Sequence, residues 1–309
     1  MRFHRLLAAC GSAVLLLPAC KSASTGQEVA NNKDPKPIGD LVERSKVETP
    51  IGKLLAELDL QIRAWTRLKM TAATAEDRTK ARELEKVIST TAHERRAELI
   101  DQLQTGPLDN RIVAASALGF TRDPEALSPL VACLEDSNPE VVGNALLGLM
   151  ILGNPDAPLE RICELLRSHP DPWVRTNAAQ CLSNLVSGGA RSKSIVSSAR
   201  LGLTDSEPGV RSHAALLLGV MLDKDSMQGL VDMIRDPVPL VSSAAIRALV
   251  WMGKHEPRSK GAAARGMAAA LQDSKANLRT QLLRGLNELA GVSYGEEPKE
   301  WIDWAARLP

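Results

Sequence analysis

Two His-Glu dipeptides are the part of this 309-residue sequence that comes closest to a metal-binding pattern. His93-Glu94 and His255-Glu256 each place an imidazole beside a carboxylate, and transition metals such as iron and zinc bind both groups. A metal site needs several such ligands on elements that bring them together. The two pairs stand in unrelated parts of the chain's helical pattern, so we expect no metal site and no cofactor.

The remaining reactive residues give no catalytic pattern. Cys133, Cys163 and Cys181 each lie in an apolar helical pattern, and none belongs to a CxxC motif. An oxidising compartment would permit a disulfide, whereas buried free cysteines behave as small hydrophobic residues. The sequence also lacks a Gly-rich phosphate loop, a nucleophile elbow and a carboxylate dyad. We therefore expect a protein that is not an enzyme.

The composition favours helices as the elements that position these residues. Hydrophobic residues make up 44% of the chain but aromatic residues only 3%, so the core must consist of Leu, Ala, Val and Ile. Such a core suits close-packed helices better than a β-sandwich and predicts an all-α fold. The net charge of +1 gives no support for binding to nucleic acid.

An apolar run near the N-terminus indicates a targeting segment. It follows Arg2 and Arg5, spans Leu6–Leu17 and ends in LPAC, Leu17–Cys20. The run is too short to span a bilayer, which takes a helix of about 20 residues. A conventional signal peptidase cutting after Ala19 would meet Leu17 where it needs a small residue.

LPAC resembles the lipobox of bacterial lipoproteins. The resemblance implies that residues 1–19 are a signal peptide and that Cys20 carries a diacylglycerol anchor in the membrane. Lys21 follows the cysteine, whereas Asp there marks inner-membrane retention in many lipoproteins, so the resemblance implies an outer-membrane lipoprotein that faces the periplasm. The alternative is an ordinary secretory peptide with a chance cysteine.

Two segments precede the main array. Residues 20–50 are polar, contain several Pro and Gly residues and have no apolar period, which predicts a disordered, lipidated tether. Residues 51–106 show apolar residues at helical spacing, interrupted near 71–77 and by a second break predicted at 89–91. We expect this segment to form a helical hairpin that caps the start of the array. The alternative is a coiled-coil dimer arm.

An apolar pattern recurs along residues 107–291. In one copy Val210 is followed by Arg211, by Ala214 and Ala215, and by Leu218. The copies are centred on Asn110, Val141, Val174, Val210, Val241 and Leu278. Four of these residues have a proline two positions earlier, where it favours a helix start. With a second apolar segment between copies, each unit predicts two antiparallel helices that stack on the next unit.

This frame resembles the HEAT-like repeats of the armadillo-type superhelical class, which implies a right-handed α-solenoid of about six units. That family often has an Asp in the turn between helices and an Arg six residues later, which form a ladder of polar contacts between units. Asp205 with Arg211 and Asp273 with Arg279 match this pattern. Asp136 and Asp236 lack the Arg, and Arg111 and Arg175 lack the Asp, so we expect a partial ladder that holds turns together.

Residues 292–309 contain Tyr294, Trp301 and Trp304 in a chain that is otherwise poor in aromatic residues. The segment is similar to the closing segment of many bacterial HEAT-repeat proteins. We expect the two tryptophans to cap the last unit by covering its leucines. The alternative is an aromatic binding patch.

The sequence as a whole favours a scaffold that binds a protein or peptide of the cell envelope on its concave face. Two basic stretches, KHEPRSK and ARSKSIVSSAR, look like long turns, and their candidate binding residues are Lys254, Arg258, Lys260, Arg191, Lys193 and Arg200. Plain solvated loops are the alternative for both stretches. The other functions left open are a structural envelope tether and an enzyme. The enzyme would resemble the HEAT-like deoxyhypusine hydroxylases, whose iron ligands are His-Glu dipeptides, or the HEAT-like phycobilin lyases.

Overall fold

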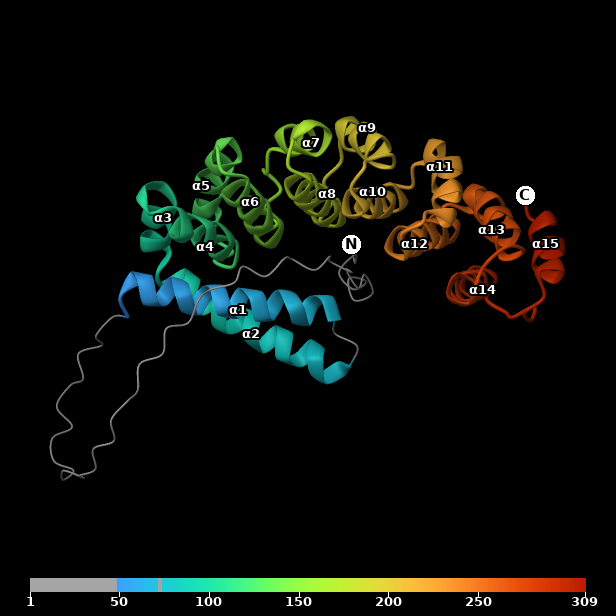
Figure 1. Ribbon diagram of the computed structural model, residues 1–309, viewed down its shortest axis with the longest axis horizontal. Helices are drawn as coiled ribbons and strands as arrows, with labels where there is room; N and C mark the ends of the chain where they lie inside the picture. The colour runs from blue at the N-terminus through green and yellow to red at the C-terminus, as the bar shows by residue number, and fades with distance from the viewer. Residues whose placement is uncertain (1–48, 72–73) are drawn as a thin grey trace, which may run out of the picture.

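The computed structural model describes residues 49–71 and 74–309 (Figure 1). Its regular elements within these ranges are all helical, which confirms the predicted all-α fold. The predicted signal peptide, the predicted lipid-attachment residue Cys20 and nearly all of the predicted tether lie outside the described residues. No helix in the described part of the chain is both long enough and apolar enough to cross a membrane.

The helices form antiparallel hairpins in chain order. Two N-terminal helices, α1 (Ile51–Thr71) and α2 (Ala75–Glu94), come before the array. The outer helices of the array are α3 (Arg96–Thr105), α5 (Leu127–Ala132), α7 (Leu159–Ser168), α9 (Lys193–Gly202), α11 (Met227–Asp232) and α13 (Pro257–Leu271). The inner helices are α4 (Leu108–Gly119), α6 (Pro139–Leu152), α8 (Pro172–Ser187), α10 (Pro208–Val220), α12 (Pro239–His255) and α14 (Ala276–Ala290). The chain ends with α15 (Pro298–Ala306).

The hairpins stack into an arc, with the outer helices on its convex side and the inner helices on its concave side (Figure 1). This confirms the predicted α-solenoid. The first hairpin pairs α3 with α4, so the array begins at Arg96 and not at the predicted residue 107. The helix break expected at 89–91 lies at Arg95 instead. Ser89 stays inside α2, and its hydroxyl bonds to the Phe120 carbonyl just after α4.

Prolines and polar caps start the inner helices where the sequence pattern placed them. Pro139 and Pro172 occupy first-turn positions of α6 and α8, where a fixed φ costs nothing and the missing N–H has no helical partner. The side chain of Asn138 accepts from the Glu140 amide at 2.8 Å, and Asp171 accepts from the Trp173 amide at 2.8 Å. These caps satisfy amides that the helix itself leaves unbonded.

Small residues let the inner helices approach closely. Any side chain at Gly119 of α4 would collide with the main chain of Gly148 on α6. A Cβ at Gly219 of α10 would lie 2.8 Å from the Cα of Ala248 on α12, which is too close for an ordinary contact. Buried leucines fill the space between the layers, and each contributes about 1.5–3 kcal/mol relative to an exposed position.

The hairpin of α1 and α2 packs against α4 from the concave side of the arc (Figure 1). The Trp65 ring stands edge-on to the Phe120 ring at 5.0 Å, and Phe120 is completely buried. The Ser89 hydroxyl donates to the Phe120 carbonyl at 2.7 Å, and Arg122 pairs with Glu85 at 3.1 Å. The hairpin therefore covers the first unit, as predicted, but it covers the inner surface of that unit.

The C-terminal helix α15 forms the predicted cap, but it packs on the outer helix α13 and not on the last inner helix α14. Trp301 is buried and its indole N–H donates to the Gly295 carbonyl at 2.9 Å. The Tyr294 and Trp304 rings contact it at centroid distances of 5.2 and 5.6 Å. The tryptophans thus close the outer layer, and one side of α14 stays uncovered by a following inner helix.

Candidate functional site

The concave side of the arc presents one continuous stripe of side chains, which we call the inner surface. Each middle inner helix packs on its outer helix and on the inner helices of both neighbours. The stripe is therefore the part of these inner helices that stays accessible to a ligand. The inner surface consists of Asn144 and Leu147 on α6, Asn177, Gln180 and Asn184 on α8, Leu216 and Val220 on α10, Arg247 and Trp251 on α12, and Arg284 and Glu288 on α14.

The chemistry of the inner surface changes along the array. On α8 it is made of amides, and Asn177 donates its amide N–H to the Trp173 carbonyl at 3.0 Å, which leaves its side-chain oxygen available. On α10 it is apolar, because Leu216 and Val220 are only partly buried. On α12 and α14 it is charged and aromatic. Amides that can pair with a peptide main chain therefore adjoin apolar residues that can hold its side chains.

One titratable group lies buried at the edge of this surface. His213 on α10 has only 5% of its surface exposed. Burial of the imidazole away from water, with a smaller contribution from the positive charge of Arg247, lowers the pKa of His213 to about 4. The imidazole is therefore uncharged at neutral pH and does not add to the charge of the inner surface.

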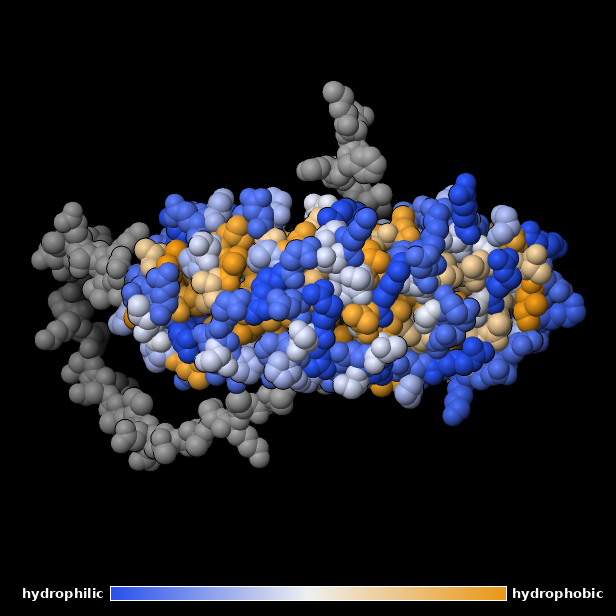
Figure 2. Space-filling model, turned by 90° about the horizontal axis from the view of Figure 1, so that it is seen from above, coloured by the Kyte–Doolittle hydropathy of each residue, from blue (hydrophilic) through white to orange (hydrophobic). Residues whose placement is uncertain are grey.

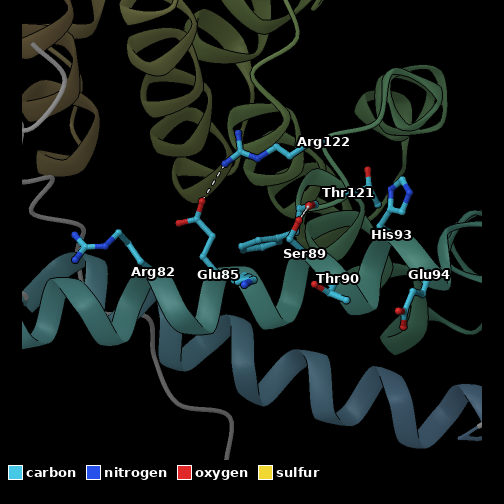
Figure 3. A pocket seen from close by; sticks show the side chains of 10 residues that line it. Arg82, Glu85, Ser89, Thr90, His93, Glu94, Thr121 and Arg122 are labelled. Atoms are coloured by element: carbon cyan, nitrogen blue, oxygen red, sulfur yellow. Dashed lines mark hydrogen bonds and ion pairs between the residues drawn. The ribbon is translucent and has the colours of Figure 1, made fainter. Parts of the chain in front are cut away.

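A groove of about 550 Å³ separates α2 from the turn that follows α4 (Figure 3). Three of its polar residues, Glu85, Ser89 and Arg122, hold the hairpin in place. The Glu85 carboxylate accepts from the Trp65 indole at 3.1 Å and from Arg122 at 3.1 Å. His93 and Glu94 point to opposite sides of α2 (Figure 3). The groove is thus mainly an intramolecular contact.

The second His-Glu dipeptide lies at the junction of α12 and α13, far along the array from the first. The His255 ring stacks on Trp251 at 3.9 Å. Glu256 caps α13 and pairs with Lys224 at 3.1 Å, and the hydrogen bond from Lys224 lowers the pKa of Glu256. The structure does not bring the two dipeptides together, and the described residues contain no group of three His, Cys, Asp or Glu side chains that could hold a metal ion.

The three cysteines are free thiols. Burial raises the pKa of Cys133 and of Cys163 to about 11 and that of Cys181 to about 12. Because the thiolate is the reactive form, these residues are poor nucleophiles at neutral pH. They act as small packing residues, and the disulfide left open by the sequence is not formed.

Arginines of three inner helices bind aspartates of the next unit. Arg111 lies 2.6 Å from Asp136, and Arg175 binds Asp205 through two hydrogen bonds of 2.8 Å. In the third pair, Arg211 and Asp236 are joined at 2.9 and 3.1 Å. Burial opposes ionisation of Asp205, but hydrogen bonds from Arg175 and the Glu207 amide outweigh it and hold the pKa of Asp205 below its usual value. The ladder therefore ties successive units together.

The HEAT-repeat family matches residues 96–183 and 196–287, which is more than half of the chain. The protein belongs to the HEAT-repeat family. None of the curated proteins matches the chain.

Several solved structures resemble the array. An engineered protein shares 19% identity with a TM-score of 0.47, over 64% of this chain and 97% of that one. A designed armadillo repeat protein in complex with the peptide (KR)4 shares 16% identity with a TM-score of 0.46, over 62% and 98%. The CpcE–CpcF complex of phycocyanin lyase from Nostoc sp. PCC7120 shares 22% identity with a TM-score of 0.43, over 67% and 93%. These identities and TM-scores are too low for the ligand or activity of these proteins to be assigned to this one.

The two stretches that match the HEAT family start at residues 96 and 196, and their first parts align without a gap. Arg111, Asp136, Pro139 and Gly153 recur as Arg211, Asp236, Pro239 and Gly253. Even the backbone repeats, because Arg122 and Leu222 both have a positive φ, of 55° and 54°. The HEAT array therefore consists of two similar halves, a period that the shorter repeats of the sequence analysis did not reveal.

The ladder runs between units, but neither Asp205 with Arg211 nor Asp273 with Arg279 forms an ion pair. Arg211 donates to the main-chain carbonyl of Asp205 at 2.8 Å, but its carboxylate partner is Asp236. Arg279 donates to the carbonyls of Leu271 and Glu296 at 3.4 and 2.5 Å, while Asp273 lies 3.7 Å from Arg235. A separation of six residues places the Arg over the carbonyls of its own turn, and the long side chain then reaches the aspartate of the next unit.

The two basic stretches of the HEAT array are not long loops. Lys254 lies in the last turn of α12, which ends at His255, and only Glu256 separates that helix from α13, because Pro257 starts a helix. Lys254 pairs with Glu288 at 2.9 Å, Lys260 is half-buried, and Arg258 is exposed in the first turn of α13.

The other stretch also consists mainly of helix, because α9 begins at Lys193. Arg191 donates to the carbonyls of Val186 and Ala190 at 2.7 and 2.6 Å. Arg200 binds Asp223 at 2.5 and 2.8 Å. Most of these cations hold helix ends and do not converge on a ligand site. The inner-surface residues were missed because Arg247 and Trp251 are far from Arg284 in sequence, although their offsets in the repeat frame would have placed them on one stripe.

Proposed function

We propose that this protein is a membrane-anchored lipoprotein of the bacterial envelope whose HEAT array acts as a non-catalytic scaffold. The array holds an extended segment of another envelope protein on its inner surface. The observation that carries this function is the inner surface itself, where the amides of Gln180 and Asn184 lie beside the partly exposed Leu216 and Val220. Repeat proteins use extended concave surfaces of this kind for binding.

The convex side is less suited to binding an extended segment. Figure 2 shows this side, on which hydrophilic residues predominate and apolar ones are scattered between them. The α1–α2 hairpin further favours the concave side, because it provides a second wall near the first units (Figure 1).

The LPAC motif supports a lipid anchor at Cys20, and the contacts of Thr49 show how the chain enters α1. Arg95 donates two hydrogen bonds of 3.1 Å to the Thr49 carbonyl, so the chain is fixed at the root of α1. A flexible linker of about thirty residues from Cys20 to this point would have a root-mean-square reach of about 30 Å. This length would let the inner surface stand clear of the lipid.

Site-specific photo-crosslinking in cells tests the scaffold. A photoreactive amino acid at Leu216, on the inner surface, should give a discrete adduct with another envelope protein. The same group at Ala269, exposed on the outer helix α13, should give none. Equal adducts from both positions, or adducts from Ala269 alone, would rule out the inner surface as the binding face.

The anchor has its own test. Cys20→Ala should abolish lipid attachment and leave an unprocessed precursor, and wild-type protein should leave the membrane only with detergent, because two or more acyl chains bind stably. Wild-type protein that is released by high salt alone, or that carries no added mass at its N-terminus, would contradict the lipoprotein assignment.

A further inference from the structure

We infer that a groove at the C-terminal end of the inner surface binds the C-terminal carboxylate of the partner segment. This binding mode rests on the scaffold function, because it takes the segment to lie along the inner helices. It adds the chemical group that is recognised and the residues that recognise it.

The groove lies between α14 and the turn that leads to α15, and it encloses about 600 Å³. Its lining includes Thr280, Arg284, Asn287, Ser293 and Glu296. Two hydrogen bonds fix the turn in place. Arg279 donates to the Glu296 carbonyl at 2.5 Å, and the Trp301 indole donates to the Gly295 carbonyl at 2.9 Å. The groove is therefore built before any ligand arrives, which reduces the entropy lost on binding.

Hydrogen-bond donors line this groove. Arg284 is exposed and has no acidic partner among residues 49–71 and 74–309. Asn287 adds an amide with N–H donors to the lining, and its side-chain oxygen is buried without a hydrogen-bond partner. The Ser293 hydroxyl accepts from the Gly295 amide at 3.3 Å and keeps its own proton to donate.

These donors match a carboxylate. A guanidinium binds both oxygens of a carboxylate in a planar fork, and neutral N–H and O–H donors can complete its hydrogen bonds. The nearby Glu288 is already paired with Lys254 at 2.9 Å, so its charge is offset. Glu296 adds one acid to the lining, which disfavours a ligand that carries a run of negative charges. A single carboxylate is the ligand group that suits one unpaired arginine.

The position of the groove indicates a chain terminus. α14 is the last inner helix, and the turn and α15 follow it directly. A segment that runs along the inner surface towards α14 therefore reaches the groove at the end of the row of inner helices, where a chain terminus can be bound. Before it reaches Arg284 it passes Leu216, Val220 and the half-buried Trp251, which can hold apolar side chains. The expected ligand is an extended segment with apolar residues and a free C-terminal carboxylate.

Peptide binding to the purified full-length chain in detergent tests this mode. The probes are octapeptides of alternating leucine and serine with an N-terminal fluorescein, prepared with a free C-terminal carboxylate or with a C-terminal amide. A third peptide has an amidated C-terminus and one internal glutamate. Fluorescence anisotropy should show that the free-acid peptide binds at least tenfold more tightly than the amide, since hydrogen bonds to a charged group are the stronger ones.

Variants then assign the carboxylate to the groove. Arg284→Gln should weaken the affinity for the free-acid peptide at least tenfold and change the affinity for the amidated peptide by no more than about twofold. Asn287→Asp, which keeps the size of the side chain but adds a negative charge, should act in the same direction. Arg235→Gln is the matched control, because Arg235 is an exposed arginine at the end of an outer segment. Circular dichroism of each variant checks that the array is folded.

Three results would overturn the inference. The free-acid and amidated peptides could bind alike, the internal-glutamate peptide could bind as tightly as the free acid, or no free-acid binding could be found up to about 1 mM. If crosslinks from Leu216 still form in cells in any of these cases, the scaffold function stands and only the terminal-carboxylate mode fails. If Arg284-dependent binding is found without those crosslinks, the groove stands and the scaffold function fails.

Discussion

The turns that follow α4 and α10 have the same local structure but different surroundings. Their shared residues are Leu118, Gly119 and Asp123 in the first turn and Leu218, Gly219 and Asp223 in the second. The first turn is closed by the α1–α2 hairpin, which buries Phe120 completely and pairs with Arg122. The second turn has no such cover among the described residues, and Val220 and Leu222 stay partly exposed. Local sequence thus fixes the repeat, whereas distant segments decide which surface remains available.

The aspartate at the start of each following outer segment shows the same principle on a smaller scale. Asp123 binds Arg96 in the first half, and Asp223 binds Arg200 in the second. The two halves are offset by 100 residues, so Arg96 corresponds to Val196, and Arg200 lies four residues, about one helical turn, further along. The carboxylate is therefore kept while its partner moves along the outer helix, so a pair of this kind cannot be located from the repeat pattern alone.

Phe120→Ala should have the largest effect, because it removes a fully buried aromatic ring that also contacts Trp65. We expect a loss of about 3–5 kcal/mol in the free energy of unfolding. Val220→Ala, at the equivalent but partly exposed position, should cost less than about 1 kcal/mol. Urea unfolding followed by circular dichroism measures both. Similar losses for the two variants would show that the second turn is as well covered as the first.

His213 gives the second half an acid sensitivity that the first half lacks, since Val113 occupies the equivalent position. The folded pKa of about 4 lies below the unfolded value of 6.5, so below pH 6.5 the unfolded chain binds a proton that the folded chain does not. Stability should therefore fall by about 3 kcal/mol as the pH drops from 6.5 to 4.

His213→Val should remove this part of the pH dependence. The measurement is urea unfolding at pH 7 and pH 4.5 for both proteins, with the difference between the two pH values compared. An equal loss of stability on acidification in the wild type and the variant would show that His213 is not the group responsible.

The ladder gives the next comparison, between the partly buried pair of Arg175 with Asp205 and the exposed pair of Arg235 with Asp273. Their side chains are 13% and 15% exposed in the first pair and 51% and 80% in the second. Arg175→Gln should cost about 1.5–3 kcal/mol, because it leaves a partly buried carboxylate without its charged donor. Arg235→Gln should cost less than about 0.5 kcal/mol.

The pH dependence separates the two pairs further. The folded pKa of Asp205 is lowered, so its stabilising effect is complete above the unfolded pKa and is lost as the pH falls through the lower folded value. Wild-type protein should lose this increment below about pH 4. Arg175→Gln should not lose it, and a variant that does would place the acid sensitivity elsewhere.

The sequence predicted the repeat units well because their signals are local. Apolar spacing and prolines such as Pro172 and Pro208 depend on residues within one helix. It failed where contacts join distant segments. Neither the pairing of Arg211 with Asp236 nor the burial of Phe120 by Trp65 follows from a periodic pattern. The groove beside Arg284 was missed for the same reason, since it needs both α14 and the turn after it.

Ser89→Ala should have a smaller effect than Phe120→Ala or Arg175→Gln. The Ser89 hydroxyl donates to the Phe120 carbonyl at 2.7 Å, and this hydrogen bond joins α2 to the first turn together with the pair of Arg122 and Glu85. Removing the donor should cost about 1–2 kcal/mol, because the carbonyl of the buried Phe120 loses this donor. Thr90→Ala is the matched control, since Thr90 is the exposed neighbour of Ser89 on α2 and should change stability by less than about 0.5 kcal/mol. Hydrogen exchange of the α2 amides reports local opening of the hairpin. Faster exchange confined to α1 and α2 in Ser89→Ala would show that the hairpin opens as a unit, whereas unchanged exchange would mean that the Trp65–Phe120 contact and the Arg122–Glu85 pair hold it without this bond.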